Sequence, residues 1–466
     1  MNYPTKALRL AHGFEFREAA ACKELARGNV VLGATSDSTT QALWLGRLAE
    51  YGRMDVNVWL DIYGAHAIYV MGKRRSGKTF TLGAIVEGLL GIDGFSTADL
   101  SQAVVVFDTM NVFLTARTPA MLVEPDPVRQ WGLPLAETGQ IDLLYPAGSP
   151  SPPDAVGANS FSVPASAFTV EDWCDLFGLD PFVAPMGQLV GDAVERAGAL
   201  GFTVDGVNYK ASNYDIERLV FCITRADELA LYDPATRTAL ARRFMALNRT
   251  GLFGNDETQF VRAGWATIFL LRDIEPALRR LLVTYLTSRI LRDRSSTEAS
   301  ERMLPVMRAK GVDTSDCESS IRSGTPRTWL IIDEAHNYIP SIGGGTCRRL
   351  LNRYITEGRN LGLSIVVATQ HPSALDPALK RNADILLIHT LTMAEDIDAA
   401  SNMLTTAIPD SIVFDNVNLV SNKNAKFAEA IRRMPRGYCL LSSDSASRVI
   451  PVAVRPRVTF HGGAGY

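Results

Sequence analysis

The stretch Gly72–Thr79, GKRRSGKT, follows the apolar run Ala67–Met71 and opens the periodic segment Thr79–Leu90. Its spacing of glycine, lysine and threonine is that of a Walker A phosphate loop, which joins a buried parallel strand to a helix. Backbone N–H groups of such a loop and the positive end of the helix together bind phosphate oxygens. The stretch therefore predicts a nucleoside triphosphate site in an α/β fold.

The side chains of this loop have specific expected tasks. Lys78 is placed to reach the β- and γ-phosphates, and the Thr79 hydroxyl is placed to bind Mg²⁺. The residues expected to contact the nucleotide are Gly72, Lys73, Arg74, Arg75, Ser76, Gly77, Lys78, Thr79 and Phe80.

A second apolar run, Trp329–Ile332, ends in the adjacent acids Asp333 and Glu334. An aspartate at a strand end usually forms a turn, but a buried strand that ends in Asp-Glu is also the Walker B arrangement. In that arrangement Asp333 holds Mg²⁺ through its water shell and Glu334 polarises the attacking water. A binding site alone needs no base, so the pattern predicts hydrolysis of ATP or GTP.

The third apolar run, Leu363–Thr369, ends at Gln370. This amide is expected to sense the γ-phosphate or to orient water; the alternative is a glutamine bonded to loop backbone. The basic helix Cys347–Asn360 leads directly into the run. We expect it to place Arg359 at the catalytic edge of the sheet, where the guanidinium would stabilise transition-state charge.

Three motifs together resemble the HerA/FtsK superfamily of P-loop ATPases, and above all its HerA-like DNA translocases. In chain order they are DEAH at 333–336, EGRNLG at 357–362 and ATQHPS at 368–373. The flanking stretches VNVWLD at 56–61 and MPRGYCLL at 434–441 agree with the family. The match covers roughly 56–111 and 326–460.

The resemblance implies a homo-hexameric ring that translocates double-stranded DNA through its pore. ATP would be the substrate and Mg²⁺ the cofactor, and a nuclease or another effector would be the partner, in anti-phage defence or DNA end-processing. It assigns Gln370 to the sensor position and Arg359 to the arginine after the Glu-Gly pair. Asp108 ends the run Val104–Phe107 at a point where the family also has an acid; it either orders water or metal or caps a turn.

The chain departs from the family at two places. Family loops have small residues where this chain has Arg74 and Arg75, and a bulky residue restricts a left-handed backbone at Arg75. These arginines reach phosphate, reach a neighbouring subunit, or are solvated. Ala65 and His66 stand where the family commonly has Arg-His, which leaves the source of a trans arginine open.

Two alternative functions follow from the departures and the family. One is an ATP-binding ring that scaffolds or switches an effector without translocating, which both departures favour. The other is a genome-packaging motor, a variant of the translocase that the sequence does not separate from it.

The chain has 466 residues, of which 47% are hydrophobic and 21% are charged, and its net charge is −3. This balance shows no global basicity, so contact with DNA would depend on a local basic pore. Six cysteines are scattered without a CxxC pair, which favours reduced thiols over a zinc site. No apolar run approaches a membrane span or a signal-peptide core, so we expect a cytoplasmic protein that does not contact a membrane.

The expected fold is α/β: a P-loop NTPase (RecA/FtsK-like) core sheet with a helical insertion and a small N-terminal β module. We place the β-barrel-like module at 1–65, the motor core at 66–111 and 251–466, and the loop-rich, helical insertion at 112–250. The helices expected there are Val170–Phe177, Val183–Ala199, Asn213–Leu231 and Pro234–Leu247. After a helix at Ile274–Arg292, the polar residues 293–327 are expected to form a mobile loop.

Overall fold

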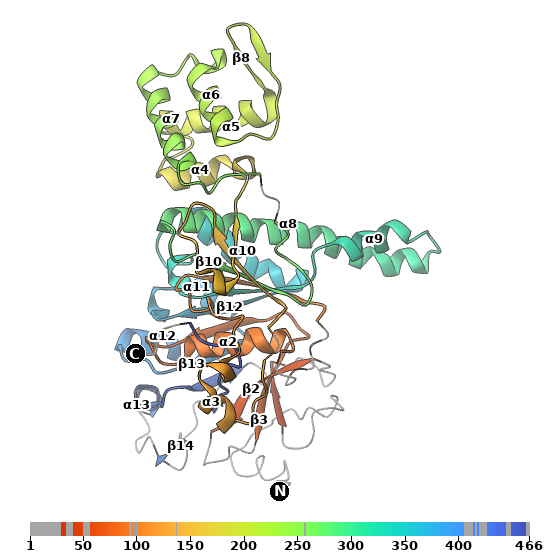
Figure 1. Cartoon of the computed structure of the whole chain (residues 1–466), viewed down its shortest axis with the longest axis vertical. Coiled ribbons are helices and arrows are strands. Elements are labelled where there is room, and N and C mark those ends of the chain that lie inside the picture. The colour runs from red at the N-terminus through yellow and green to blue at the C-terminus, as the bar shows by residue number, and fades with distance from the viewer. Residues whose placement is uncertain are drawn as a thin grey trace.

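One mixed sheet of 13 strands organises the chain (Figure 1), in the order β1-β3-β2-β17-β16-β13-β4-β12-β11-β5-β10-β6-β7. The computed structural model describes residues 29–33, 41–49, 56–92, 96, 98, 100–136, 138–255, 258–404, 413–414, 417–418, 426–443 and 449–462. The strands of this sheet are β1 (Asn29–Leu32), β2 (Ala42–Leu48), β3 (Asn57–Asp61), β4 (Ala67–Met71), β5 (Ala103–Asp108), β6 (Ile141–Pro146), β7 (Asn159–Phe161), β10 (Ala266–Leu270), β11 (Thr328–Ile332), β12 (Leu363–Thr369), β13 (Ile385–Ile388), β16 (Tyr438–Ser443) and β17 (Ile450–Val454).

The strand directions divide the sheet into two parts. From β13 through β4, β12, β11, β5, β10 and β6 to β7, every neighbouring pair is parallel. The pairs β13–β16, β16–β17, β17–β2 and β2–β3 are antiparallel. Because the carboxyl ends of parallel strands meet at one edge, the residues that follow β4, β11 and β12 are neighbours there.

Helices cover both faces of the sheet, as an α/β fold requires. The helices are α2 (Lys78–Leu89), α3 (Pro125–Gln130), α4 (Val170–Phe177), α5 (Pro185–Glu195), α6 (Ile216–Arg225), α7 (Pro234–Asn248), α8 (Pro276–Ala309), α9 (Ser315–Ser323), α10 (Gly345–Glu357), α11 (Pro377–Asn382), α12 (Ala394–Ser401) and α13 (Lys426–Arg433). In Figure 1, α2 lies on one side of the strands, and α8 and α10 lie on the other.

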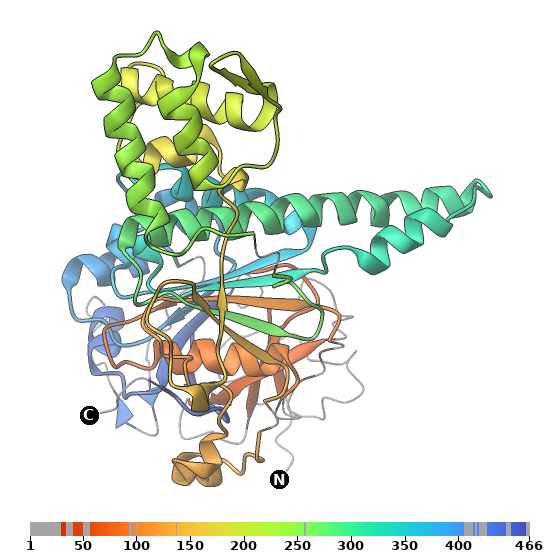
Figure 2. The ribbon, with the colours of Figure 1, turned by 45° about the horizontal axis from the view of Figure 1, so that its top comes forward.

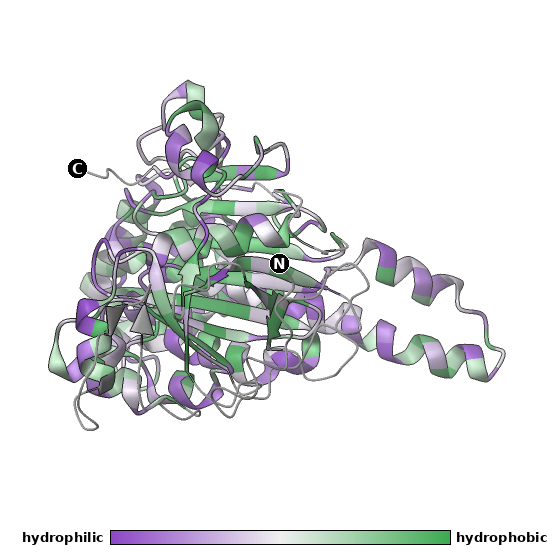
Figure 3. Ribbon diagram, turned by 90° about the horizontal axis from the view of Figure 1, so that it is seen from below, coloured by the Kyte–Doolittle hydropathy of each residue, from purple (hydrophilic) through white to green (hydrophobic). Residues whose placement is uncertain are grey.

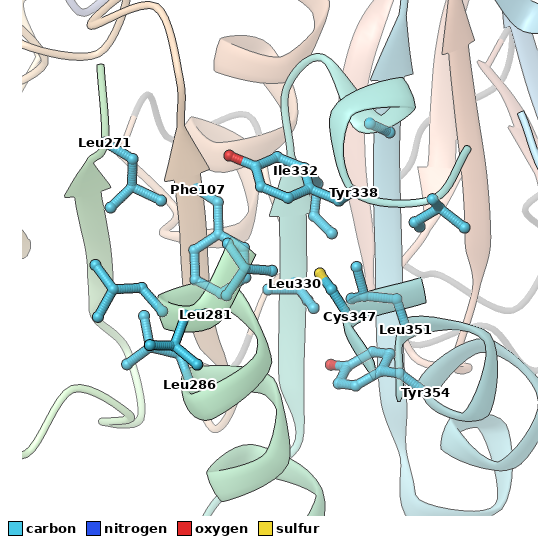
Figure 4. Close-up of a cluster of buried hydrophobic side chains, with 14 of the residues drawn as sticks. Phe107, Leu271, Leu281, Leu286, Leu330, Ile332, Tyr338, Cys347, Leu351 and Tyr354 are labelled. Atoms are coloured by element: carbon cyan, nitrogen blue, oxygen red, sulfur yellow. The ribbon is translucent and has the colours of Figure 1, made fainter. Parts of the chain in front are cut away.

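Alternate side chains of the central strands pack into two separate hydrophobic cores. Leu330 and Ile332 of β11 belong to the core under α8 and α10, whereas Trp329 and Ile331 belong to the core around α2. Figure 4 shows the first core, where Leu330 and Phe107 meet side chains from α8 and α10. The unbroken apolar run of each strand is therefore explained by burial on both faces.

Two of the predicted domains contribute strands to this one sheet, so their predicted boundaries separate strands that are neighbours in it. Within 1–65, the described strands β1, β2 and β3 extend the main sheet through β17 and do not close into a barrel of their own. Within 112–250, β6 and β7 form one edge of the same sheet. The domain division stays a prediction, but both outer segments contribute strands to the core sheet.

Helices α4, α5, α6 and α7 of 112–250 form a lobe that stands above α8 in Figure 1, whereas α3 lies on the side of the sheet where α2 lies. The structure has α4 at the residues predicted and α5, α6 and α7 within one to six residues of the predicted limits. A hairpin that we did not predict, β8 (Phe202–Val204) with β9 (Val207–Tyr209), lies between them. Its turn, Asp205-Gly206, has positive φ at both residues (50° and 80°), as a two-residue hairpin turn requires. A second short hairpin joins β14 (Val413–Phe414) to β15 (Val417–Asn418).

The prediction of a mobile loop at 293–327 was wrong. Helix α8 continues for 34 residues, and α9 folds back along it, so the two form an arm that extends beyond the sheet (Figure 2). Arg294 anchors the arm: it is 1% exposed, and its guanidinium donates to the Leu361 carbonyl (2.7 Å) and to Glu301 (2.8 Å). The polar composition reflects the solvated surfaces of both helices, and Figure 3 shows the arm with purple bands among pale and green ones.

Two further predictions from sequence concern membrane-spanning helices and the state of the cysteines. Within the described ranges, no helix has both the length and the apolar character that crossing a membrane needs. The cysteines in the described part of the chain, Cys174, Cys222, Cys317, Cys347 and Cys439, are all free thiols; Cys22 lies outside it. The cytoplasmic location stays a prediction.

Candidate functional site

The phosphate loop leaves the carboxyl end of β4 and enters α2, and neighbouring segments hold it in shape. The Lys73 N–H donates to the Thr390 carbonyl (2.7 Å), and the Gly437 N–H donates to the Ser76 carbonyl (3.2 Å). Gly77 has a φ of 120°, and a Cβ there would lie 3.2 Å from the Gly437 nitrogen. A glycine is therefore required at the point where the loop turns into the helix.

Arg75 has a left-handed backbone, with a φ of 64°. This is the conformation that the sequence suggested an arginine would resist, and it costs an L-residue about 1–2 kcal/mol. The side chains of Arg74 and Arg75 are exposed and line the same cavity as the loop. The role of both arginines stays a prediction.

A cavity of about 610 Å³ opens beside the loop. Of the residues predicted from sequence, it is lined by Arg74, Arg75, Gly77, Lys78, Thr79, Phe80, Asp333, Glu334 and Gln370. Gly72, Lys73 and Ser76 complete the loop. The volume lies within the range of small-molecule sites, so the parallel sheet brings three distant motifs together around a space that fits a nucleotide.

Lys78 lines this space, and Ser76 stands two positions before it in the loop. Lys78 is 5% exposed, and its Nζ donates to the Lys73 carbonyl at 3.3 Å. Burial lowers the pKa of Lys78, while the nearby carboxylates of Glu334 and Asp333 act in the opposite direction. The buried Ser76 Oγ has no hydrogen-bond partner among the described residues. Lys78 is thus arranged as a donor for an anion in the cavity.

Asp333 and Glu334 follow β11 and are 2% and 7% exposed. Burial, followed by the charges of Glu334 and Asp108, raises the pKa of Asp333 to about 7. Such a carboxylate gains from a nearby cation, which would restore its ionised form. Glu334 has a left-handed backbone (φ 52°), a strained conformation that turns its side chain at the end of the strand.

Gln370, at the end of β12, contacts Glu334 directly. Its side-chain amide donates to Glu334 Oε1, whereas Glu334 Oε2 is buried without a hydrogen-bond partner in the described part of the chain. His336 Nδ1 lies 3.5 Å from that oxygen and 3.2 Å from Thr369 Oγ1. Burial lowers the pKa of His336, which favours a neutral imidazole here. The two oxygens of Glu334 are therefore distinct. Gln370 holds Oε1, whereas Oε2 is available to accept a proton.

The residues present fit Mg²⁺ of the kind that nucleotides carry. Among the described residues, no cluster of three or more His, Cys, Asp or Glu side chains is placed to hold a metal. Mg²⁺ with a nucleotide needs no such cluster, because one or two protein ligands, water and phosphate oxygens suffice. The Thr79 hydroxyl and the Asp333 carboxylate line one cavity with Lys78, so they would supply the protein's share.

Two roles were open for Asp108 in the sequence, ordering water or metal and capping a turn. The structure shows it capping a turn. Its Oδ1 accepts from the Met110 and Val112 N–H groups (both 3.1 Å), and its Oδ2 accepts from the Phe113 N–H (2.7 Å). Both oxygens therefore cap the turn after β5. The side chain is 0% exposed, and burial raises its pKa despite these bonds.

Sequence reasoning missed several residues of the site. Arg272, Arg436 and His461 line the cavity. Arg272 follows the end of β10, so a polar residue just after an apolar strand was a signal for it. His389 is 0% exposed beneath the loop, and its Nδ1 donates to the Tyr438 carbonyl (2.8 Å). Burial lowers the pKa of His389 to about 3; its Nε2 therefore accepts from the Thr81 hydroxyl (2.9 Å) and fixes the start of α2.

The structure does not bring Arg359 to this cavity, which corrects the expected position. Arg359 precedes β12 and Gln370 follows it, and a strand of seven residues spans about 23 Å. Arg359 instead donates to Asp384 Oδ2 (3.0 Å), and its side chain is 64% exposed. It lines a separate cavity of about 250 Å³ at the amino edge of the sheet, with His66 and Asp384.

His66 lies in this second cluster and is held on both sides. Its Nδ1 lies 2.8 Å from Asp384 Oδ2, and its Nε2 lies 3.0 Å from Asp61 Oδ2. Burial alone would lower the pKa of His66, but the hydrogen bonds and charges of Asp384 and Asp61 outweigh burial and raise it to about 9. Because His66 is 4% exposed, its charge interacts with Asp61 and Asp384 and not with solvent.

This cluster predicts a dependence of stability on pH. Since the pKa of His66 is raised from 6.5 to about 9 on folding, its contribution is fully present below pH 6.5 and is lost as the pH rises through 9. The shift corresponds to about 3 kcal/mol of unfolding free energy. Urea unfolding at pH 6, 7, 8 and 9 should show this decline in wild type and a flatter profile in His66→Gln. An exposed control, His371→Gln, should keep the wild-type slope; equal slopes in all three proteins would contradict the assignment.

Comparison with solved structures agrees with the fold. The structure of VirB4 of Thermoanaerobacter pseudethanolicus superposes with a TM-score of 0.52 and 12% identity, over 88% of this chain and 96% of that one. The chain has the fold of VirB4. The predicted fold, an α/β core sheet of the P-loop NTPase kind, is thereby confirmed.

A second solved structure superposes on this chain less well. The plasmid coupling protein TrwB in complex with ADP and Mg²⁺ has a TM-score of 0.49 and 13% identity, over 85% of this chain and 86% of that one. No family model and no curated protein matches the sequence.

Proposed function

We propose that this protein is an ATP-dependent translocase of double-stranded DNA, of HerA type, that works as a homo-hexameric ring. The observation that carries the ATPase part is the cavity in which Lys78, Asp333 and Glu334 meet. A phosphate-binding lysine, a metal-binding acid and a base lie there around one space of nucleotide size.

The chain's own residues have defined parts in hydrolysis. Lys78 and the backbone of the loop bind the β- and γ-phosphates and oppose the charge that develops on them. The free oxygen of Glu334 accepts a proton from the attacking water, while Gln370 holds the other oxygen and so orients the carboxylate. Mg²⁺, held by Thr79 and Asp333, would neutralise the β- and γ-phosphate oxygens.

The ring is supported by the position of Arg359. This residue is exposed at the amino edge of the sheet, about 23 Å from the edge where Glu334 lies, so it cannot serve its own subunit. A second copy that presents its amino edge to the nucleotide cavity would complete the site. A homo-hexamer is the closed arrangement that the resemblance implies.

Translocation of duplex DNA, with a nuclease or another effector as partner, rests on the resemblance of the three motifs. A motor needs contact with the DNA backbone and not with a particular base sequence. A DNA translocase with a partner nuclease would suit defence against phage or DNA end-processing. A genome-packaging motor would use the same chemistry.

A second candidate function is an ATP-binding ring that switches an effector without moving DNA. The observation that favours it is Ala65, which stands where the resemblance expects an arginine, beside a His66 that is buried between Asp61 and Asp384. An arginine there would be available to a neighbouring subunit, whereas Ala65 has no charge to offer. In this function Arg359 would couple adjacent sites.

Steady-state ATP hydrolysis with and without duplex DNA tests the two candidates. We expect hydrolysis that DNA stimulates, and we expect Lys78→Ala to reduce it to background in both conditions, because the lysine that binds phosphate is gone. Hydrolysis that ignores DNA, or tight ATP binding without hydrolysis, would replace the translocase with the switch. A protein that stays monomeric in sedimentation at all concentrations, with and without ATP, would contradict the ring in both.

A further inference from the structure

The segment after β17 crosses helix α2 and reaches the nucleotide cavity, which His461 and Gly462 line. Buried Glu87, on α2, accepts from the Arg455 guanidinium (2.7 Å). It also accepts from the Thr459 N–H (2.9 Å) and hydroxyl (2.6 Å) and from the Val458 N–H (3.2 Å). Glu87 and Arg455 are 1% and 0% exposed. A buried carboxylate with this many donors fixes the segment rigidly on the helix.

The same segment is tied on its other side to the residues that follow β5. The Phe460 N–H donates to the Thr118 carbonyl (2.7 Å), and the Phe460 carbonyl accepts from the Thr115 hydroxyl (2.9 Å). The Gly462 N–H donates to the Val112 carbonyl (3.2 Å). His461 lies between these bonds, so its backbone is held from both sides.

His461 stacks on Phe80, with ring centroids 4.5 Å apart and an interplanar angle of 18°. Phe80 stands in the first turn of α2, two positions after Lys78. Both rings line the nucleotide cavity. The cavity therefore has a charged end at Lys78 and Asp333 and an aromatic end at Phe80 and His461, to which Met110 and Leu114 add apolar surface.

We propose that the Phe80–His461 pair is a platform on which the nucleobase of the bound nucleotide stacks. This inference rests on the proposed function, because it needs a nucleoside triphosphate in the cavity. With the phosphates at Lys78, the base lies toward the aromatic end, and a π-face is what a flat heteroaromatic base binds. Purines have a larger stacking surface than pyrimidines, so the platform favours ATP over UTP.

The experiment compares three ligands by isothermal titration calorimetry at fixed Mg²⁺. For His461→Ala we expect the dissociation constant for ATP to rise by about 5- to 100-fold, the range that loss of one stacking contact gives. Inorganic tripolyphosphate should bind as it does to wild type, because it has no base. The preference of wild type for ATP over UTP should shrink in the variant, and His461→Phe should restore it.

Two further measurements separate stacking from a general disturbance of the site. Steady-state kinetics of His461→Ala should show a raised KM for ATP with little change in kcat, as expected for binding that is equal in ground and transition states. Phe182→Ala removes an aromatic side chain that is 80% exposed on the helical lobe, and this control should bind all three ligands normally.

The outcomes are distinguishable. If His461→Ala binds ATP as wild type does, the platform does not exist. If ATP and tripolyphosphate weaken equally, the C-terminal segment supports the phosphate loop and does not bind the base. If wild type binds neither ATP nor tripolyphosphate, the nucleotide site itself fails, and the proposed function fails with it.

Discussion

Replacing Glu334 with glutamine is expected to reduce ATP hydrolysis by about 10²- to 10⁴-fold, the range for loss of a general base, while ATP still binds. The amide keeps the shape of the side chain, and its oxygen can still accept from Gln370. What it lacks is the basic oxygen: Glu334 Oε2 is buried and makes no hydrogen bond within the described residues. Lys78 and the phosphate loop are unchanged, so the affinity for ATP should stay within a few-fold of wild type.

Single-turnover hydrolysis, with ATP binding measured in parallel, tests this prediction. Glu318→Gln is the matched control, because Glu318 is a partly exposed carboxylate on the arm and pairs with Arg308 at 2.9 Å. It makes the same chemical change far from the cavity and should leave the rate unaltered. A Glu334→Gln protein that keeps more than a tenth of the wild-type rate would mean that another group accepts the proton.

Replacing Arg359 with alanine is expected to reduce hydrolysis by about 10³-fold or more, the effect of an arginine finger, without lowering ATP affinity. The guanidinium is 64% exposed, and Asp384 holds it in place together with buried His66. Because it lies at the opposite edge of the sheet from Glu334, its contribution must come from the neighbouring subunit. The control is Arg349→Ala, an exposed arginine on α10.

Mixing two inactive proteins provides the decisive form of this test. Lys78→Ala subunits lack a working site but retain Arg359; Arg359→Ala subunits retain the site but lack the guanidinium. If Arg359 acts in trans, mixed rings contain intact sites at the junctions, and hydrolysis returns on mixing. No recovery in rings shown to have exchanged subunits would rule out a trans role for Arg359.

Much of the fold and half of the site follow from local patterns. The strand, loop and helix around Lys78 are predictable because a buried strand, a glycine-bearing turn and a helical start are each encoded within a few residues. The same holds for Asp333 and Glu334 after β11 and for Gln370 after β12. Their meeting at one edge follows from the parallel direction of the strands.

Other features are decided only in the folded chain. Asp108 was ambiguous in sequence, because only the folded turn shows that three backbone N–H groups occupy its carboxylate. Residues 293–309 looked like a loop by composition, since the buried Arg294 that anchors the helix has partners more than 30 positions away. The bonds of Asp108 are local, to residues up to Phe113, whereas the bonds that anchor the arm are tertiary, and short-range propensity is a weak guide to them.

From sequence alone come the predictions of nucleotide chemistry: a lysine for phosphate, a threonine and an aspartate for metal, and a glutamate for water. Tertiary structure alone decided where the remaining groups act. It placed Arg359 at the far edge of the sheet, and it brought His461 onto Phe80 through Glu87 and Thr459, which stand 372 positions apart. The physical reason is that catalytic motifs depend on local backbone geometry, whereas the approach of distant segments depends on the register of the whole sheet and on buried charges that no short pattern encodes.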